Sequence, residues 1–141
     1  MEYLFTIDTR LPGMNELIDA NRRDKRAGNR MKQQSQDTVR FYIYRDLPGL
    51  RIEGRVFLQY RFYEENRRRD LDNISGFAHK VTQDALVHAG VLKNDGWAHI
   101  AGMQDSFYVD AKRPRIEVII REVYADGCRE QKQRNSAPGG L

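Results

Sequence analysis

The sequence predicts an α/β fold of the α+β kind, with a small mixed β-sheet of about four strands and two main helices. Three observations predict it. Residues 52–63 alternate apolar and polar side chains, as a strand with one buried face does. Residues 71–89 repeat apolar side chains at helical spacing, and Gly90 ends the segment. Residues 115–123 alternate again, so strands and helices share one domain.

The other elements follow from weaker patterns. Residues 2–8 alternate and predict a first strand, and residues 16–20 predict one or two helical turns. A second main helix is expected to begin after Asn29, which would cap it, and to run to about Asp46. Residues 99–108 predict a further strand. We therefore expect one domain over residues 1–124 and a polar, disordered tail over residues 125–141.

Charge and composition narrow the range of functions that the protein can have. The 141 residues carry a net charge of +4, which favours a polyanionic partner. The single cysteine excludes an intrachain disulfide and a Cys-based zinc site. We see neither a signal peptide nor an apolar run long enough to span a membrane, so we expect a cytoplasmic protein.

The stretch from residue 67 to residue 95 carries the chemical information. Three arginines, Arg67 to Arg69, precede Asp70 and Asp72 at the start of the predicted helix, and Asp95 follows beyond its end. Hard divalent cations bind several carboxylate oxygens that converge on one point. A magnesium ion there would relieve the repulsion between carboxylates and could also bind a phosphodiester. Lys80 lies near the same helix face as Asp72, about 12 Å further along the axis.

Each of these residues also has an ordinary structural explanation. Asp70 could be a helix N-cap, and Asp72 could favour the positive end of the helix. Lys80 and Asp84 could form a surface pair one turn apart. Asp95 lies in a sequence that suits a turn. The prediction of a site therefore rests on the order of these residues rather than on any one of them.

In that order the chain closely resembles the RusA family of Holliday-junction resolvases, found mainly in phages and prophages. The matching segments are Arg68-Arg69-Asp70-Leu71-Asp72-Asn73, Lys80, Asp84-Ala85-Leu86, Ala89-Gly90-Val91 and Asn94-Asp95. The resemblance implies that Asp70, Asp72 and Asp95 bind metal and act in catalysis, and that Lys80 is the family's helix lysine. It also implies a homodimer, Mg²⁺ or Mn²⁺, and symmetrical nicking of four-way DNA junctions.

Two departures from the family pattern are visible. The family often has two aspartates where this chain has Asn94-Asp95, and the second is kept. The segment from Asp72 to Lys80 is about one helical turn longer than in the best-known members, which moves Lys80 about 5 Å further away.

The function predicted from the sequence is metal-dependent hydrolysis of DNA phosphodiesters at branched DNA. Backbone phosphates would contact a set of basic side chains: Arg67, Arg68, Arg69, Arg22, Arg23, Lys25, Arg26, Arg30 and Lys32. Three alternatives stay open: a junction-binding protein without cleavage, a metal nuclease for forks, flaps or RNA, and a structural phage protein with a basic face.

Overall fold

The computed structural model describes residues 1–123, so the expected C-terminal tail lies outside the described residues. Four strands form one sheet: β1 (Glu2–Ile7), β2 (Arg55–Glu64), β3 (Ile100–Val109) and β4 (Arg115–Val123). Three helices accompany it: α1 (Met14–Arg23), α2 (Lys25–Asp46) and α3 (Leu71–His88). The predicted α+β class with a mixed four-stranded sheet is confirmed.

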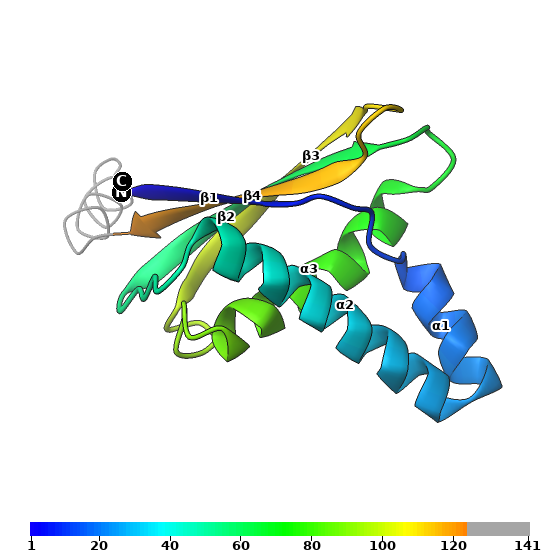
Figure 1. Cartoon of the computed structure of the whole chain (residues 1–141), viewed down its shortest axis with the longest axis horizontal. Helices are drawn as coiled ribbons and strands as arrows, with labels where there is room; N and C mark the ends of the chain where they lie inside the picture. Colours follow the sequence, from blue (N-terminus) through cyan, green and yellow to red (C-terminus); the bar gives the residue numbers. More distant parts are fainter. Residues whose placement is uncertain (124–141) are drawn as a thin grey trace, which may run out of the picture.

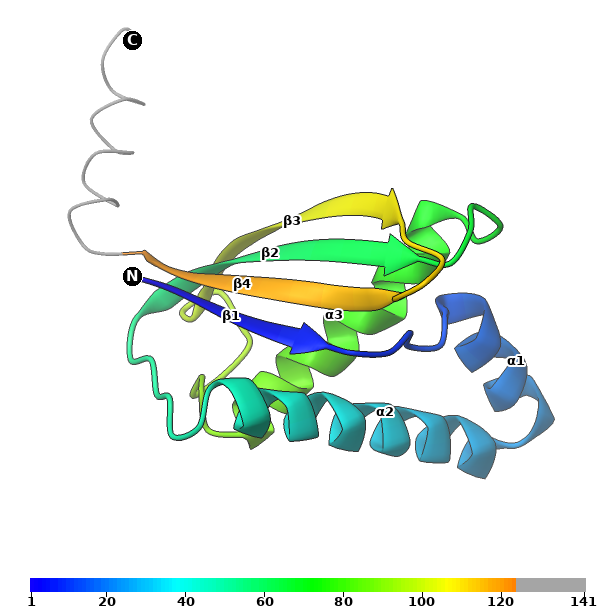
Figure 2. The same ribbon diagram turned by 45° about the horizontal axis from the view of Figure 1, so that its top comes forward.

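The strand order in the sheet is β1-β4-β2-β3. β4 pairs antiparallel with both β1 and β2, whereas β2 and β3 are parallel neighbours. A parallel pair needs a crossover connection, and α3 provides it. α3 therefore runs along the whole length of the sheet, from the C-terminal ends of β2 and β3 back to their N-terminal ends (Figures 1 and 2).

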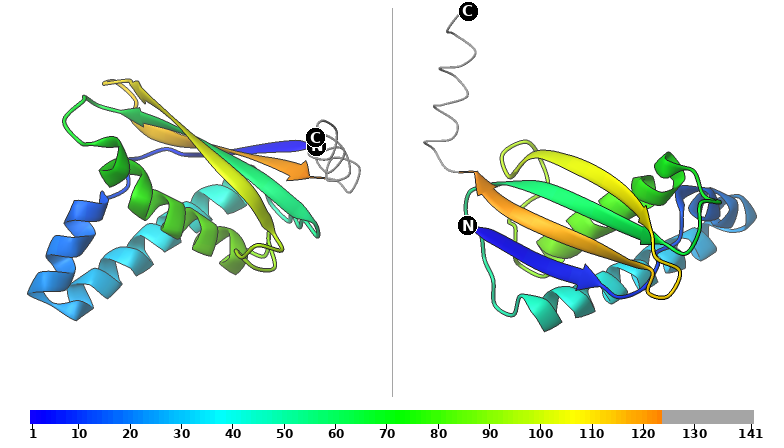
Figure 3. Two further views of the ribbon diagram at one scale, coloured as in Figure 1. Left: turned by 180° about the vertical axis from the view of Figure 1, so that it is seen from behind. Right: turned by 90° about the horizontal axis from the view of Figure 1, so that it is seen from above.

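The core lies between the sheet and the three helices, which cover the same face (Figure 3). The inward residues of β2 are fully buried, as its alternation predicts: Val56, Leu58, Tyr60 and Phe62. The apolar stripe of α3 is buried too: Ile74, Phe77, Ala78, Val81 and Ala85. Burial of these side chains supplies most of the favourable free energy of folding.

The start of the second helix differs from the prediction. α2 begins at Lys25, and its cap is Asp24, whose side chain accepts a hydrogen bond from the backbone of Arg26 at 3.0 Å. Asn29 therefore lies inside the helix. Gly28 also lies inside α2. At this position α2 packs against α1 so closely that an added Cβ would come within 1.6 Å of the Asn21 side chain.

The sheet face without helices carries paired charged and aromatic side chains. Arg115 lies over the ring of Tyr63 at 3.8 Å, and Tyr63 stacks on Tyr108 at 5.0 Å. Arg61 and Arg115 both form ion pairs with Glu117. These contacts explain why aromatic residues lie on the more polar side of β2. None of the described helices is long and apolar enough to cross a membrane.

Replacing Tyr60 with phenylalanine should lower the free energy of unfolding by about 1 kcal/mol, because the Tyr60 hydroxyl is buried and hydrogen-bonds Thr82 at 2.9 Å. Burial also raises the pKa of Tyr60 to about 12. Urea unfolding measures the change. Tyr44→Phe, at an exposed position on α2, is the control and should leave stability unchanged. Equal effects of the two substitutions would contradict the buried hydrogen bond.

Candidate functional site

Asp70 and Asp72 lie at the N-terminal end of α3 with exposed carboxylates. Asp70 occupies the N-cap position, yet its side chain makes no capping hydrogen bond. Neither carboxylate has a hydrogen bond or ion pair within residues 1–123, and the same holds for Asp95. Asp19 is the only other described acidic side chain without such a partner. Simple helix capping therefore does not account for Asp70.

A largely buried ion pair between Arg69 and Glu64 fixes the loop that leads into α3. Arg69 donates from Nε and Nη2 to the two carboxylate oxygens of Glu64, at 2.9 and 2.8 Å, and from Nη1 to the backbone oxygen of Leu11 at 3.2 Å. This pair joins the end of β2, the segment after β1 and the start of α3. Arg69 thus uses its guanidinium inside the protein, whereas Arg67 and Arg68 are exposed.

Asn73 anchors the first turn of α3 to α1. Its Oδ1 accepts a hydrogen bond from the backbone of Asn15 at 2.7 Å. Gly13 lies so close that an added Cβ would be 2.6 Å from the same oxygen, so a larger residue at position 13 would displace the Asn73 side chain. Local sequence patterns give no sign of this contact between Asn73 and Gly13, because it joins residues far apart in the chain.

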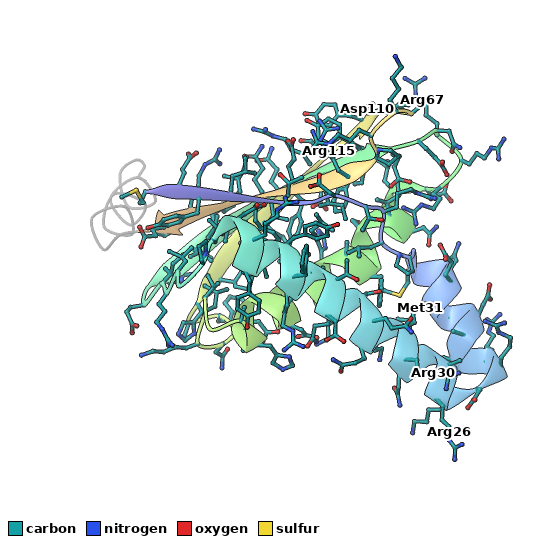
Figure 4. All side chains as sticks on the ribbon, in the orientation of Figure 1. Arg26, Arg30, Met31, Arg67, Asp110 and Arg115 are labelled. Carbon is teal, nitrogen blue, oxygen red and sulfur yellow. The ribbon has the colours of Figure 1, made fainter. Side chains whose placement is uncertain are left out.

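Asp70 lies on the rim of a cavity of about 660 Å³ between the start of α3 and the C-terminal ends of β2 and β3. Its lining is mixed and includes Arg67 and Arg69 as well as Leu71, Ile74 and Phe107. Figure 4 shows Arg67 projecting from the tip of the loop between β2 and α3. An open cavity bordered by the exposed side chains of Asp70 and Arg67 can accept a phosphate-bearing ligand.

Asp105 also lines this cavity and forms a pair with His79. The Nε2 atom of His79 lies 2.7 Å from Asp105 Oδ1, and both side chains are about one-fifth to one-quarter exposed. Asp105 is the only charged residue of β3. This pair was not predicted from the sequence. The signal that could have revealed it is the single acidic residue in an otherwise uncharged strand, together with a histidine on the neighbouring helix.

Asp95 lies at the other end of α3. It borders a hollow of about 270 Å³ that is also lined by Gln83 and by the first residues of β3. Asn94 accepts a hydrogen bond from the backbone of Gly96, which forms a tight turn around Asp95. Gln83 is eleven residues beyond Asp72, or about 16 Å along the helix axis. Asp70 and Asp72 therefore lie at one end of α3, and Asp95 lies near the other end.

Among residues 1–123, no three histidine, cysteine or acidic side chains are arranged to hold a metal ion. Lys80 is exposed, and its Nζ lies 3.6 Å from Asp84 on the next turn, which is the ordinary surface pair. A single copy of the chain thus presents two carboxylates at one end of α3 and one at the other.

The basic residues between positions 22 and 32 form the exposed tip where α1 meets α2, at the same end of the molecule as Asp70. Figure 4 shows Arg26 and Arg30 pointing away from the sheet at this tip. The members of the run are exposed: Arg22, Arg23, Lys25, Arg26, Arg30 and Lys32. This cationic tip and Arg67 flank the N-terminal end of α3, where Asp70 and Asp72 lie. The arrangement suits contact with a phosphate backbone.

An α+β domain that presents unpaired carboxylates beside exposed arginines has the features of enzymes that act on phosphodiesters. A comparison with protein-family models identifies the family: residues 20–121 match the model described as Endodeoxyribonuclease RusA. The match covers more than half of the chain, so the protein belongs to the RusA family of endodeoxyribonucleases. A comparison with curated proteins gave no match.

Removing Arg69, whose side chain is 14% exposed, should weaken the fold far more than removing its exposed neighbour Arg68. Arg69→Ala leaves Glu64, only 8% exposed, without its main partner, and should lower the free energy of unfolding by about 3 kcal/mol. Arg68→Ala is the matched control and should change stability by less than about 0.5 kcal/mol. Thermal and urea unfolding of both variants measure this difference. Similar losses in both would contradict the anchoring role of Arg69.

Proposed function

We propose that this protein is a magnesium-dependent endonuclease that resolves four-way DNA junctions by symmetrical nicks and acts as a homodimer. Membership of the RusA family supports nuclease activity on branched DNA. The observation that carries the proposal is the pair Asp70 and Asp72, whose free carboxylates lie on one helix end beside the exposed Arg67 and Arg68. We also propose that it works in the cytoplasm, in DNA recombination and repair, and that its origin is a prophage.

In this proposal Asp70 and Asp72 hold Mg²⁺, for which Mn²⁺ can substitute, and Asp95 is the third carboxylate. Oxygen donors of this kind suit a hard divalent cation. When bound, the ion lowers the pKa of a water molecule and offsets negative charge on the scissile phosphate. The donor set of one subunit is incomplete for this role, because Asp95 lies at the far end of α3.

The remaining roles concern binding and charge. Arg67, Arg68 and the basic tip hold backbone phosphates, while Arg69 keeps the loop in place through Glu64. Lys80 is assigned to orient water or to offset developing negative charge. Its exposed position allows this, since the contact with Asp84 at 3.6 Å is a weak surface pair.

Two other functions use the same surface. A junction-binding protein without cleavage would need the arginines but not the free aspartates. A nuclease for forks, flaps or RNA would need both. Incubating the purified protein with labelled four-way, forked, flapped and linear DNA and with RNA, with and without Mg²⁺, separates these functions from the proposed one.

Asp70→Asn, Asp72→Asn and Asp95→Asn should each abolish junction nicking and leave junction binding equal or stronger. Each substitution removes a negative charge that a metal ion requires but that repels phosphate. Gel shifts and nicking assays on the same labelled junction measure the two properties. Asp19→Asn, at the other unpaired acid, is the control and should keep wild-type nicking. Wild-type rates in any two of the three variants would overturn the assignment.

Alanine at Arg22, Arg23 or Lys25 should weaken binding to all DNA forms to a similar degree. Each lost phosphate contact should flatten the plot of log K against log salt by about one unit. Filter binding over a range of salt concentrations measures the slope. An unchanged slope in all three variants would show that the tip between α1 and α2 faces away from DNA.

A further inference from the structure

A stack of side chains crosses the helix-free face of the sheet at one end. Arg115 of β4, Tyr63 of β2 and Tyr108 of β3 occupy matched register positions on neighbouring strands. The guanidinium of Arg115 lies 3.8 Å from the centre of the Tyr63 ring. The rings of Tyr63 and Tyr108 stack with 5.0 Å between their centres and 22° between their planes. The stack therefore runs across the strands toward the edge of the sheet.

The stack ends in an uncovered ring face. β3 is an edge strand, so no strand among residues 1–123 lies beyond Tyr108. Tyr108 is 47% exposed, although one side of its ring packs on Tyr63. Within the described part of the chain, Tyr63 is its only aromatic neighbour and its hydroxyl has no hydrogen-bond partner. The outer face of Tyr108 can therefore accept another flat group.

Ion pairs hold the stack in place from its inner end. The side chain of Arg115 is 13% exposed and donates from Nη1 to Asp110 at 2.9 Å and from Nε to Glu117 at 3.2 Å. The backbone N–H of Asp110 donates to the backbone oxygen of Glu64 at 2.8 Å, which keeps the ends of β2 and β3 together. An aromatic ring that is already fixed loses little conformational entropy when a ligand stacks on it.

The uncovered ring lies beside the candidate functional site. Tyr108 lines the same cavity as Asp70 and Arg67. Figure 4 shows Arg115, Asp110 and Arg67 at this same end of the sheet. A group that stacks on Tyr108 would therefore lie next to the arginine that borders the cavity and next to a carboxylate of the proposed metal site.

The chemistry of this corner suits a nucleotide whose base is unpaired. Nucleobases stack on aromatic side chains, and every base has a flat face, so stacking is tolerant of sequence. Arg67 and Arg68 are exposed and have no acidic partner within residues 1–123, so they can hold the phosphate. A base inside an intact duplex is covered on both faces by its neighbours and cannot lie on a tyrosine.

We propose that the outer face of Tyr108 is a stacking site for an unpaired base at the branch point of DNA, and that this site makes the protein prefer branched DNA to linear duplex. The inference rests on the proposed nuclease function and specifies how its substrate is distinguished. Arg67 contacts the phosphate of the stacked nucleotide, which places the neighbouring backbone at the cavity beside Asp70.

This division of roles has a measurable consequence. Contacts with phosphates are available on every form of DNA and carry no information about branching. Stacking on Tyr108 adds binding free energy only where a base is unpaired, as at a branch point, where the paired arms end. Loss of the ring should therefore change the ratio of junction binding to duplex binding, whereas loss of a phosphate contact should lower both together.

The first test compares a four-way junction with a linear duplex of the same arm sequence, by gel shift without Mg²⁺. Tyr108→Ala should weaken junction binding about tenfold, the contribution of one stacked base, and leave duplex binding unchanged. Tyr108→Phe keeps the ring and should bind both DNA forms as wild type does. Tyr44→Ala is the matched control, because Tyr44 is 52% exposed but lies on α2, and it should change neither affinity.

The second test locates the stacked base in the wild-type protein. Iododeoxyuridine, a thymidine analogue that forms a covalent bond to a stacked aromatic ring under ultraviolet light, replaces one thymidine beside the branch point. Mass spectrometry should find the cross-link on Tyr108. The same analogue in the middle of an arm, or in the linear duplex, should give no cross-link to Tyr108, and neither should the Tyr108→Ala variant with the junction.

The outcomes separate this inference from the proposed function. Equal losses of junction and duplex binding in Tyr108→Ala, or a branch-point cross-link to other residues only, would overturn the stacking site. A lower mass of Tyr108→Ala in light scattering, with unchanged DNA preference, would assign the ring to a contact with a second copy and would overturn it as well. A wild type that cross-links through Tyr108 but nicks no DNA would overturn the proposed function alone.

Discussion

The parallel pairing of β2 with β3 is the constraint on which the rest of the structure depends. Two parallel neighbours can be joined only by a chain that returns along the full length of the sheet, and the 18 residues of α3 do so over about 27 Å. The residues just before α3 therefore lie at one end of the sheet, and the residues just after it lie at the other end. This separation sets Asp70 and Asp72 apart from Asp95.

The same crossover explains why the loop before α3 is so firmly held. The chain must turn sharply from the end of β2 into the helix, and Arg69 fixes that turn by binding Glu64 and the backbone of Leu11. Asn73 then ties the first helical turn to α1. With these two anchors inside the protein, the carboxylates of Asp70 and Asp72 stay exposed, and neither has a partner within residues 1–123.

Local patterns predicted most of the fold. The alternation of β2 and the apolar stripe of α3 identified both elements, because burial on one face imposes their spacing. The predicted start of α2 was wrong by five residues, since the cap at Asp24 depends on how α1 ends. Asp70 and Asp72 could be recognised together because they are neighbours in the sequence. The position of Asp95 and the internal role of Arg69 depend instead on the topology of the chain, which no local sequence pattern contains.

The central claim is that Asp70 and Asp72, at the start of α3, hold a divalent cation. The most direct measurement is anomalous diffraction from crystals soaked with Mn²⁺, which locates the ion without reference to activity. The account predicts a peak bounded by the carboxylates of Asp70 and Asp72. A peak remote from Asp72, or no peak at all, would contradict it.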